Sequence, residues 1–438
     1  MRLQPEVRIS QCMIVKNEEK NIEKALSWGK EILWEQIVVD TGSTDKTVEI
    51  AKQMGAKVFH FPWKDDFAAA KNYALQQASG NWIAFLDADE TFSKKDAEQL
   101  KKLLKKIHKN KELDFVRCKM LHVKNSEIKE NIAASCQDRI FRNTPQLQYR
   151  YRIHEQLYHK TKEIPRGYDA QEELVIIHTG YGVEVNREEK GKRNARLLEK
   201  ELQENPKAGT LWAYLGDAYD MAGKTKEALN CYRKVLWDSE ITGKEGLAGI
   251  HAGLQILRIR SNEPTEDTKK EFFKVDEMLN ALGWERHPDI DYYMGFWYAK
   301  TGNLEKSAEL FEQALEKMEV YNGDEIVQTT CNLEFPNYIV AGASLNRKEL
   351  PKAVKYAVAA IRINKYSPDA VKVLLAAFCM ESKKGVDAAE YWDFLCKIYD
   401  RENLKDILFL YKFIQETGFE SLEKLIWKEL PEEVRQCL

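Results

Sequence analysis

The chain has 438 residues, of which 44% are hydrophobic and 31% are charged, and its formal net charge at neutral pH is −3. This length predicts two or more domains, and the composition excludes a wholly disordered chain because it can supply buried cores. The near-zero charge provides no global positive field, so nucleic acid is not an expected partner.

Strands and helices alternate in the N-terminal part of the chain, up to Leu86. This alternation predicts βαβ units and a mostly parallel sheet, in which ligands bind beyond the carboxyl ends of the strands. Asp40, Asp87 and Asp89 lie at such ends. Thr44 or Asp45 suits the N-cap of the helix predicted over residues 45–54. The apolar runs predict strands over residues 9–15, 36–40, 57–61 and 81–86, and the patterns between them predict helices over residues 18–28, 45–54 and 66–78.

The pattern changes between about residues 114 and 182, where short apolar runs mix with polar loops and prolines. We interpret this segment as antiparallel strands and a variable loop that complete the first domain. After Asn186 the sequence is charged and helical to its end. We therefore expect an α/β domain followed by an all-α domain.

The helical part contains a repeat with the spacing of a tetratricopeptide unit, a helix-turn-helix of about 34 residues. Its small residues allow the two helices of a unit to approach closely, and roughly three or more units must stack to bury their apolar faces. The alternative, a run of unrelated amphipathic helices, is less favoured because one copy matches at six positions. The copies comprise Trp212, Leu215, Gly216, Tyr219, Ala228 and Tyr232; then Met294, Gly295, Tyr298, Gly302, Ser307, Phe311 and Ala314; and, more weakly, Ala353, Ala357 and Ala360.

Targeting segments and cysteines indicate the compartment. The start of the chain shows no signal-peptide pattern, and no stretch reaches the roughly 18 apolar residues of a membrane helix. The 8 cysteines are scattered and none lies in a C-x-x-C pair, which argues against a zinc site or a disulfide framework. We expect a soluble, reduced, cytoplasmic protein without a membrane span.

The strongest chemical signal is Asp87-Ala88-Asp89, directly after a predicted buried strand. Two carboxylates separated by one small residue suit a hard cation such as Mg²⁺ or Mn²⁺, which prefers oxygen ligands and keeps positions for water and substrate phosphates. A lone D-x-D is common, and a strand-end turn with solvated acids is the alternative interpretation. The sequence around it decides between the two.

Four ordered motifs resemble those of GT-A glycosyltransferases of family 2, which are inverting enzymes that use a nucleotide-sugar donor. They are MIVKNEE at residues 13–19, VDTGSTD at 39–45, DFAAAKN at 66–72 and DAD at 87–89. The resemblance implies a GT-A domain over residues 1–190. We expect tetratricopeptide-like repeats over residues 191–381 and a C-terminal helical cap over residues 382–438.

The resemblance also assigns roles to residues in these motifs. Asp89 is expected to hold the metal, Asp87 to contact the ribose and the metal through water, and Asp40 to accept a hydrogen bond from the base. Lys71 is expected to add positive charge near the donor, although a solvated helix lysine is the alternative. The full set expected to bind the nucleotide sugar is Val15, Asn17, Glu18, Asp40, Lys71, Asn72, Asp87, Ala88 and Arg193.

A second cluster follows late in the same domain, where GT-A enzymes place the base that faces the acceptor. Glu155 is the predicted general base, which removes the acceptor proton as the nucleophile attacks. His154 is expected to orient Glu155 or to contact a phosphate, and His178 is expected to complete the metal site; a structural histidine is the alternative for both. Basic candidates for the pyrophosphate are Arg139, Arg142, Lys190, Lys192 and Arg193.

The order of domains resembles a subgroup that includes bacterial peptide S-glycosyltransferases of the glycocin class. This resemblance implies transfer of a hexose, from a UDP-sugar, to Cys or Ser of a peptide or protein, and a homodimer through the helical domain. Two alternatives remain: the same chemistry on a saccharide or lipid-linked envelope acceptor, and a non-catalytic repeat scaffold with a degenerate transferase domain. The two predicted metal-binding acids disfavour the scaffold.

Overall fold

The computed structural model describes residues 6–123, 131–162, 164–179, 187–243, 246–284, 287–321, 327, 332–382 and 387–436, with the side chains of 131–133 left out. The predicted variable loop falls partly on 124–130 and 180–186, outside the described residues. The chain divides into two compact units, one of Met1–Pro206 with Asp217–Lys224 and one of Lys207–Gly216 with Thr225–Leu438. The predicted boundary at residue 190 lies within a helix, and the predicted domain limits stay predictions.

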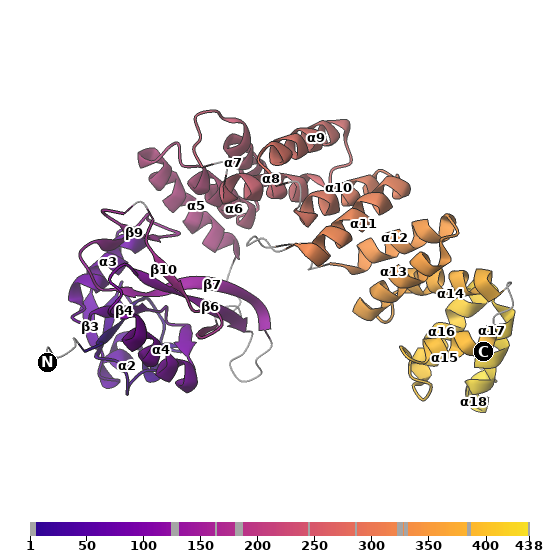
Figure 1. The fold of residues 1–438 in the computed structure, drawn as a ribbon, viewed down its shortest axis with the longest axis horizontal. Helices are drawn as coiled ribbons and strands as arrows, with labels where there is room; N and C mark the ends of the chain where they lie inside the picture. Colours follow the sequence, from indigo (N-terminus) through magenta and orange to yellow (C-terminus); the bar gives the residue numbers. More distant parts are fainter. Residues whose placement is uncertain are drawn as a thin grey trace. The chain divides into compact units, whose positions relative to one another are not determined.

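The first unit is an α/β domain, as predicted (Figure 1). Four parallel strands lie in the order β3-β2-β1-β4, and the helices of the predicted alternation connect them. The strands are β1 (Ile9–Val15), β2 (Glu35–Asp40), β3 (Lys57–His60) and β4 (Trp82–Phe85), and the helices are α1 (Ile22–Ser27), α2 (Thr47–Gln53) and α3 (Phe67–Gln77). The order brings the carboxyl ends of β1, β2 and β4 to one edge of the sheet.

The predicted N-cap of α2 is wrong. The residue before the helix is Lys46, and it makes no side-chain cap hydrogen bond. Asp45 lies one position before this residue and accepts a hydrogen bond from the N–H of the first helical residue, Thr47, at 3.0 Å. The α3 helix does begin with the expected type of cap, because Asp66 accepts from the Ala69 N–H at 2.8 Å.

Helices cover both faces of this sheet. Met13, Val15 and Val38 share one buried cluster with α1 and α2, and Trp82 and Ala84 on the same face pack with the helix α4 (Lys94–Ile107). The opposite face packs against α3 through a cluster that contains Cys12, Ile37, Val39, Ile83, Phe85, Ala68 and Ala74. Alternate residues along each strand therefore face opposite sides of the sheet. Both sides are buried, as is typical of a parallel sheet.

The rest of the sheet differs from the prediction. The β6–β7 and β4–β7 pairs are antiparallel as expected, but β10 and β11 pair with β6 in parallel. The prediction of only antiparallel strands is therefore wrong. The loops between the strands bring β10 and β11 beside β6 in the same direction as β6. The further strands of this sheet are β5 (Glu90–Phe92), β6 (Phe115–Val123), β7 (Asn131–Arg142), β10 (Gly167–Asp169) and β11 (Val175–His178). The strands β8 (Leu147–Arg150) and β9 (Gln156–His159) pair in antiparallel orientation as a separate sheet.

From Arg187 onward the described chain is helical, as predicted. The first of these helices, α5, belongs to the first unit, and α6 contributes to both units. The helices are α5 (Arg187–Glu204), α6 (Gly209–Met221), α7 (Thr225–Trp237), α8 (Leu247–Arg260), α9 (Glu266–Ala281), α10 (Pro288–Lys300), α11 (Leu304–Val320), α12 (Glu334–Asn346), α13 (Leu350–Ile363), α14 (Pro368–Ser382), α15 (Ala388–Leu395), α16 (Leu404–Thr417), α17 (Glu420–Glu429) and α18 (Glu432–Arg435).

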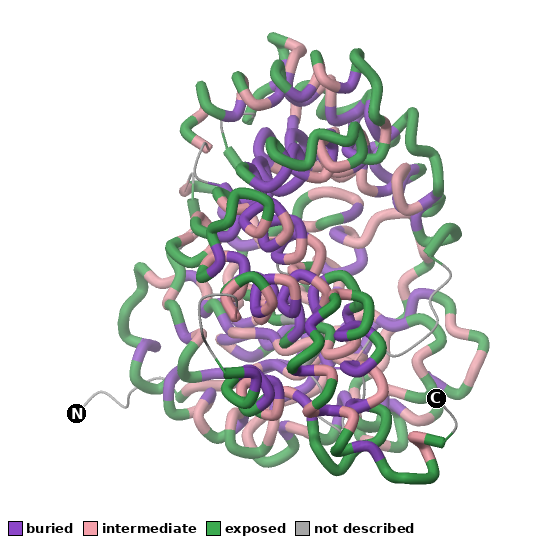
Figure 2. The backbone as a smooth tube through the Cα atoms, turned by 90° about the vertical axis from the view of Figure 1, so that its right-hand side faces the viewer, coloured by how far each residue is buried: buried purple, intermediate pink, exposed green. Residues whose placement is uncertain are grey.

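The residues of the repeat pattern lie where the two helices of one repeat meet. A Cβ on Gly216 of α6 would lie 2.4 Å from the ring of Tyr232 on α7, and a Cβ on Gly295 of α10 would lie 2.8 Å from the ring of Phe311 on α11. Ser307 also donates a hydrogen bond to the Gly295 carbonyl at 2.9 Å. Buried positions recur along the helices between exposed ones (Figure 2). Small residues opposite rings therefore hold these helix pairs together.

Within the described residues, no helix combines the length and the apolar character that crossing a bilayer requires. The predicted cytoplasmic location stays a prediction.

Candidate active site

A cavity of about 610 Å³ lies at the carboxyl edge of the sheet in the first unit. Val15 ends β1, Asp87 and Asp89 lie in the turn between β4 and β5, and His178 ends β11. The segment between β8 and β9 and the helices α3 and α5 contribute further walls. Ten of the predicted site residues line it: Val15, Glu18, Lys71, Asp87, Ala88, Asp89, His154, Glu155, His178 and Arg193.

Three predicted nucleotide-binding residues do not line this cavity. The Asp40 carboxylate accepts hydrogen bonds from the N–H groups of Gly42 and Ser43 at 3.2 and 3.0 Å. Asn17 accepts from the Thr44 N–H at 2.8 Å, and Asn72 bonds to the Tyr149 backbone in both directions. These contacts order the loop after β2 and anchor α3 to β8. Binding of the nucleotide by Asn17, Asp40 or Asn72 stays a prediction.

The Asp89 carboxylate forms an ion pair with His178, with Oδ2 and Nε2 3.2 Å apart. His178 Nδ1 lies 3.0 Å from Nδ1 of His122, whose Nε2 lies 2.9 Å from the Ser135 hydroxyl. Burial lowers the pKa of His178, but the hydrogen bond to Asp89 and the nearby acids outweigh it and raise the pKa above its usual value. Burial and the His178 charge lower the pKa of His122. His122 therefore helps to hold the His178 ring in position, a role that was not predicted from the sequence.

The Asp87 side chain has a cationic partner. Arg139 of β7 donates one hydrogen bond to Asp87 at 2.9 Å and another to Glu90 at 2.5 Å. Burial raises the pKa of Asp87, but the charges of Lys71, Arg139 and His178 lower it below its usual value. Burial and the Asp87 charge raise the pKa of Glu90, which is 2% exposed. The Asp87 and Glu90 pair thus shares one guanidinium.

Lys71 is almost fully buried, with 2% of its surface exposed, and its ammonium forms an ion pair with the Glu155 carboxylate. The same ammonium lies 5.0 Å from the centre of the Phe85 ring and 5.1 Å from that of Tyr149. A buried cation requires such partners. Lys71 is therefore not a solvated helix lysine, and its cation holds Glu155 in the cavity wall.

His154, next to Glu155, has a backbone φ of 53° and lies in the left-handed region. This conformation is uncommon for a residue with a side chain and is found most often at functional turns. The turn directs both His154 and Glu155 to the cavity that they line.

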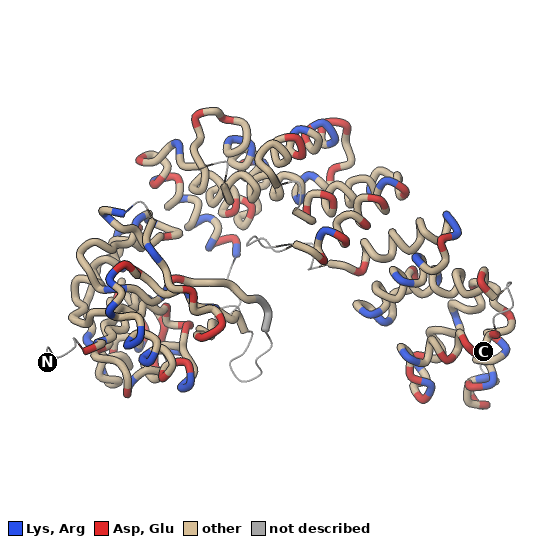
Figure 3. Tube along the Cα trace, viewed as in Figure 1, with Lys and Arg blue, Asp and Glu red and all other residues tan. Residues whose placement is uncertain are grey.

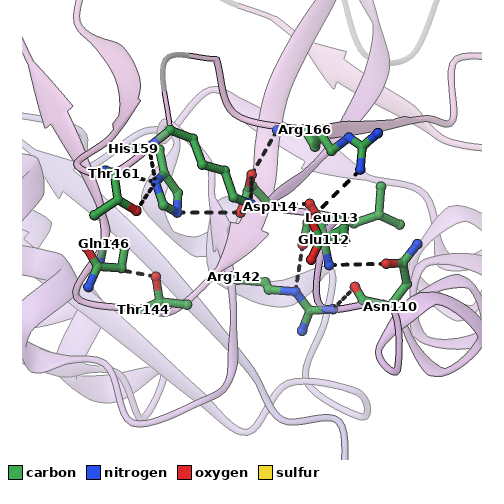
Figure 4. A network of polar contacts seen from close by, with 11 residues as sticks. Asn110, Glu112, Leu113, Asp114, Arg142, Thr144, Gln146, His159, Thr161 and Arg166 are labelled. Carbon is green, nitrogen blue, oxygen red and sulfur yellow. Dashed lines mark hydrogen bonds and ion pairs between the residues drawn. The ribbon is translucent and has the colours of Figure 1, made fainter.

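The basic candidates divide into two groups. Arg139, Lys190 and Arg193 line the cavity. Lys192 instead pairs with Glu188 at 2.6 Å on the exposed face of α5. Arg142 is buried, with its guanidinium donating to the carbonyls of Leu113 and Asn110 at 2.7 and 2.8 Å (Figure 4). The geometry makes Arg142 a structural residue and contradicts its assignment to the pyrophosphate.

Sequence reasoning also missed several walls of the cavity. Glu90, which does not line the cavity but accepts a hydrogen bond from Arg139, is the third acid of the run Asp-Ala-Asp-Glu, which was a usable signal. Trp63 and Phe67 line the cavity with their rings 4.7 Å apart, and Gln137 reaches it from β7. No local spacing connects β7 to the turn after β4, because that contact arises from the antiparallel pairing of two distant strands.

The cavity residues fit a divalent cation. The Asp89 and His178 pair offers one oxygen and one nitrogen ligand, and Asp87 lines the cavity two residues away. Among the described residues, no group of three His, Cys, Asp or Glu side chains is gathered for a metal. Mg²⁺ is commonly held by one or two carboxylates, with phosphates and water as its other ligands.

Residues 10–170 match the family model for glycosyl transferase family 2. This part of the chain therefore carries the family 2 glycosyltransferase domain that the resemblance predicted. The α/β domain followed by a helical region also agrees with the predicted fold class.

Curated relatives extend this likeness. The chain is 32% identical over 228 residues to a TPR repeat-containing protein of Synechococcus elongatus, covering 50% of this chain and 54% of that protein. It is 29% identical over 227 residues to the SPbeta prophage-derived glycosyltransferase SunS of Bacillus subtilis, covering 51% of each. The chain thus spans about half the length of these curated relatives.

Among solved structures, the chain is similar to glucosyl-3-phosphoglycerate synthase from Mycobacterium tuberculosis in complex with Mn²⁺, uridine diphosphate and glucosyl-3-phosphoglycerate. The identity is 23%, the TM-score is 0.23, and the match covers 27% of this chain and 44% of the other.

Proposed function

We propose that this protein transfers a hexose from a nucleoside diphosphate sugar, a UDP-sugar, to a peptide or protein side chain with inversion at the anomeric carbon. The observation that carries the proposal is that one cavity is lined by both the Asp89–His178 pair and the Lys71–Glu155 pair. The first pair suits the charged leaving group, and the second suits the attacking nucleophile. The family 2 match of residues 10–170 supports the same chemistry.

In the proposed reaction, the Ser oxygen or Cys sulfur of the acceptor forms a bond to the anomeric carbon. The bond from that carbon to the diphosphate oxygen breaks, and its electron pair leaves with the nucleoside diphosphate. Glu155 accepts the acceptor proton, and Lys71 keeps its carboxylate in position. A single displacement of this kind inverts the anomeric configuration.

The donor side needs positive charge for the diphosphate. Arg139, Lys190 and Arg193 line the cavity and can neutralise part of it. Asp89 and His178 would hold Mg²⁺ or Mn²⁺, with Asp87 close by, and the ion would stabilise the leaving group as a Lewis acid. The Trp63 and Phe67 rings offer an apolar surface for a flat base.

The acceptor proposal rests on the helical unit. Helix-pair repeats commonly bind peptides or a second copy of the same chain, and the glycine–ring contacts of α6–α7 and α10–α11 are typical of such repeats. The likeness to a TPR repeat-containing relative supports this assignment. We propose a peptide as the acceptor and a homodimer through the helical unit as the assembly.

The test uses the full chain with a panel of UDP- and GDP-sugars, Mn²⁺, and Cys- or Ser-containing peptides beside oligosaccharides. Mass spectrometry is expected to find a hexose mass on a peptide. Adducts on oligosaccharides and never on peptides would support the saccharide acceptor and contradict the peptide proposal. Failure of every donor to bind or turn over with any divalent metal would support the scaffold alternative.

A further inference from the structure

A second cavity, of about 480 Å³, lies in the first unit at the opposite edge of the sheet. Its walls include Arg8, just before β1, and Trp34, just before β2. These are the amino ends of the strands, whereas the candidate active site lies beyond the carboxyl ends. Because β1 has 7 residues, the two edges are about 20 Å apart. The volume falls in the range of about 300–1,000 Å³ found for small-molecule sites.

One wall of this cavity is cationic. Lys101, Lys105 and Lys109 line it at intervals of four residues along α4 and its C-terminal end. Lys and Arg positions along α4 are coloured in Figure 3. Within the part of the chain that the structure describes, none of the three lysines forms an ion pair. Like charges at this spacing repel one another, so an anion between them would stabilise the arrangement.

A buried donor lies in the same wall. His108 is 6% exposed, and its Nδ1 accepts a hydrogen bond from the Trp82 indole N–H at 3.0 Å. The proton of the neutral ring is therefore on Nε2. That nitrogen is buried and has no hydrogen-bond partner among the described residues. A buried N–H without an acceptor is costly, so the site favours a ligand that supplies one.

The remaining walls suit a ring that carries hydroxyl groups. Trp34 is 54% exposed, the Arg8 guanidinium lies 5.0 Å from its ring centre, and its indole N–H donates to Ser79 at 3.1 Å. Both contacts hold the ring in place. Glu6 and Glu31 also line the cavity and can accept hydrogen bonds from hydroxyl groups.

We propose that this cavity is a binding site for a sugar phosphate, separate from the donor site. The phosphate lies between the lysines of α4 and receives the His108 Nε2–H. The sugar packs against Trp34, and its hydroxyl groups donate hydrogen bonds to Glu6 and Glu31. Lysines bind phosphate as point charges through charge-assisted hydrogen bonds.

The test is calorimetric titration of the full chain with glucose 1-phosphate. Binding is expected, and the Lys101→Gln/Lys105→Gln variant is expected to lose about tenfold or more in affinity. Lys102→Gln is the matched control, because Lys102 is exposed on the same helix and does not line the cavity. Asp89→Ala is expected to retain binding, which separates this site from the donor site.

Amide hydrogen exchange locates the ligand. Glucose 1-phosphate is expected to protect residues 31–34 and 101–109. The proposal is overturned by absence of binding, by equal loss of affinity in Lys102→Gln, or by protection only of the turn that contains Asp87 and Asp89.

Phosphatidylcholine vesicles with and without phosphatidylglycerol form the second arm of the test. Binding to the anionic vesicles alone, with no affinity for glucose 1-phosphate, would make this a lipid contact and overturn the sugar-phosphate proposal.

Discussion

The two units use buried residues for different purposes. The N-terminal unit gathers charged groups around a cavity, including Lys71, Glu155 and Arg139. The repeats of the helical unit place glycine against a ring, as at Gly216 and Tyr232. Buried charges contribute little net stability and are costly when a partner is lost, whereas close glycine–ring packing contributes directly to stability. The comparison predicts that substitutions in the N-terminal unit mainly reduce activity, whereas substitutions in the helical unit mainly reduce stability.

The largest separation of the two units is expected from Asp89→Ala. This change removes the carboxylate that pairs with His178, and donor turnover is expected to fall to background because the diphosphate loses its cation site. Circular dichroism is expected to show unchanged helix content. Asp138→Ala is the control, because Asp138 pairs with Arg117 and does not line the cavity. Near-normal turnover by Asp89→Ala would remove Asp89 as the metal anchor.

Glu155→Gln sharpens the same contrast within the cavity. Loss of the general base is expected to slow transfer to a Ser peptide by about a hundredfold or more, while titration shows unchanged donor affinity. A Cys peptide is expected to retain more activity, because a thiol with a pKa of about 8.5 ionises without a strong base. Equal rates for the variant and the parent on the Ser peptide would place the base elsewhere.

Gly216→Ala is expected to affect the helical unit and leave catalysis intact. Its new Cβ would lie 2.4 Å from the buried Tyr232 ring, and the overpacking is expected to lower the free energy of unfolding by about 1–3 kcal/mol. Gly342→Ala is the matched control: it lies in α12 with nothing within 4 Å of its Cβ. That change is expected to raise stability by up to about 1 kcal/mol.

Urea unfolding followed by circular dichroism, beside an assay of donor turnover, compares the two glycine variants. Destabilisation of the same size in both would mean that the Tyr232 contact does not set the cost. A loss of donor turnover in Gly216→Ala at temperatures where the variant is folded would contradict the prediction that this substitution leaves catalysis intact.

The smallest effect concerns a charge of the first unit outside the cavity. Burial raises the pKa of Glu35, but hydrogen bonds from Lys57, Ser79 and Ser10 lower it to about 2. Because this folded-state pKa lies below the usual value of about 4.3, the stabilisation is present above that value and is lost as the pH falls toward 2. The stability difference between the parent and Glu35→Gln should shrink over this range in urea titrations. A difference that stays constant down to low pH would contradict the assignment.

Much of the fold could be predicted from local sequence patterns. The four parallel strands and three helices up to β4 were predictable, because apolar runs and caps such as Asp66 act over short distances. The parallel pairing of β10 and β11 with β6 was not, because pairing direction depends on the path of long loops.

The candidate site shows the same division. Asp87 and Asp89 were predicted from a motif, and Glu155 from the position of the base in the family that the chain resembles. The Arg139 contact with Asp87 and Glu90 required the tertiary structure. Asp40 was predicted to bind the base from its family-like motif at a strand end, yet its carboxylate accepts hydrogen bonds from the backbone of the following turn. A strand end places a residue at the edge of the sheet without fixing the direction of its side chain.

Release of nucleoside diphosphate from a UDP-hexose by the full chain tests the central claim most directly, namely that the carboxyl edge of the first unit is a donor site. The account predicts turnover with Mn²⁺, loss of turnover after chelation, and recovery when the metal is restored. Absence of donor binding and turnover with every hexose and every divalent metal would contradict it.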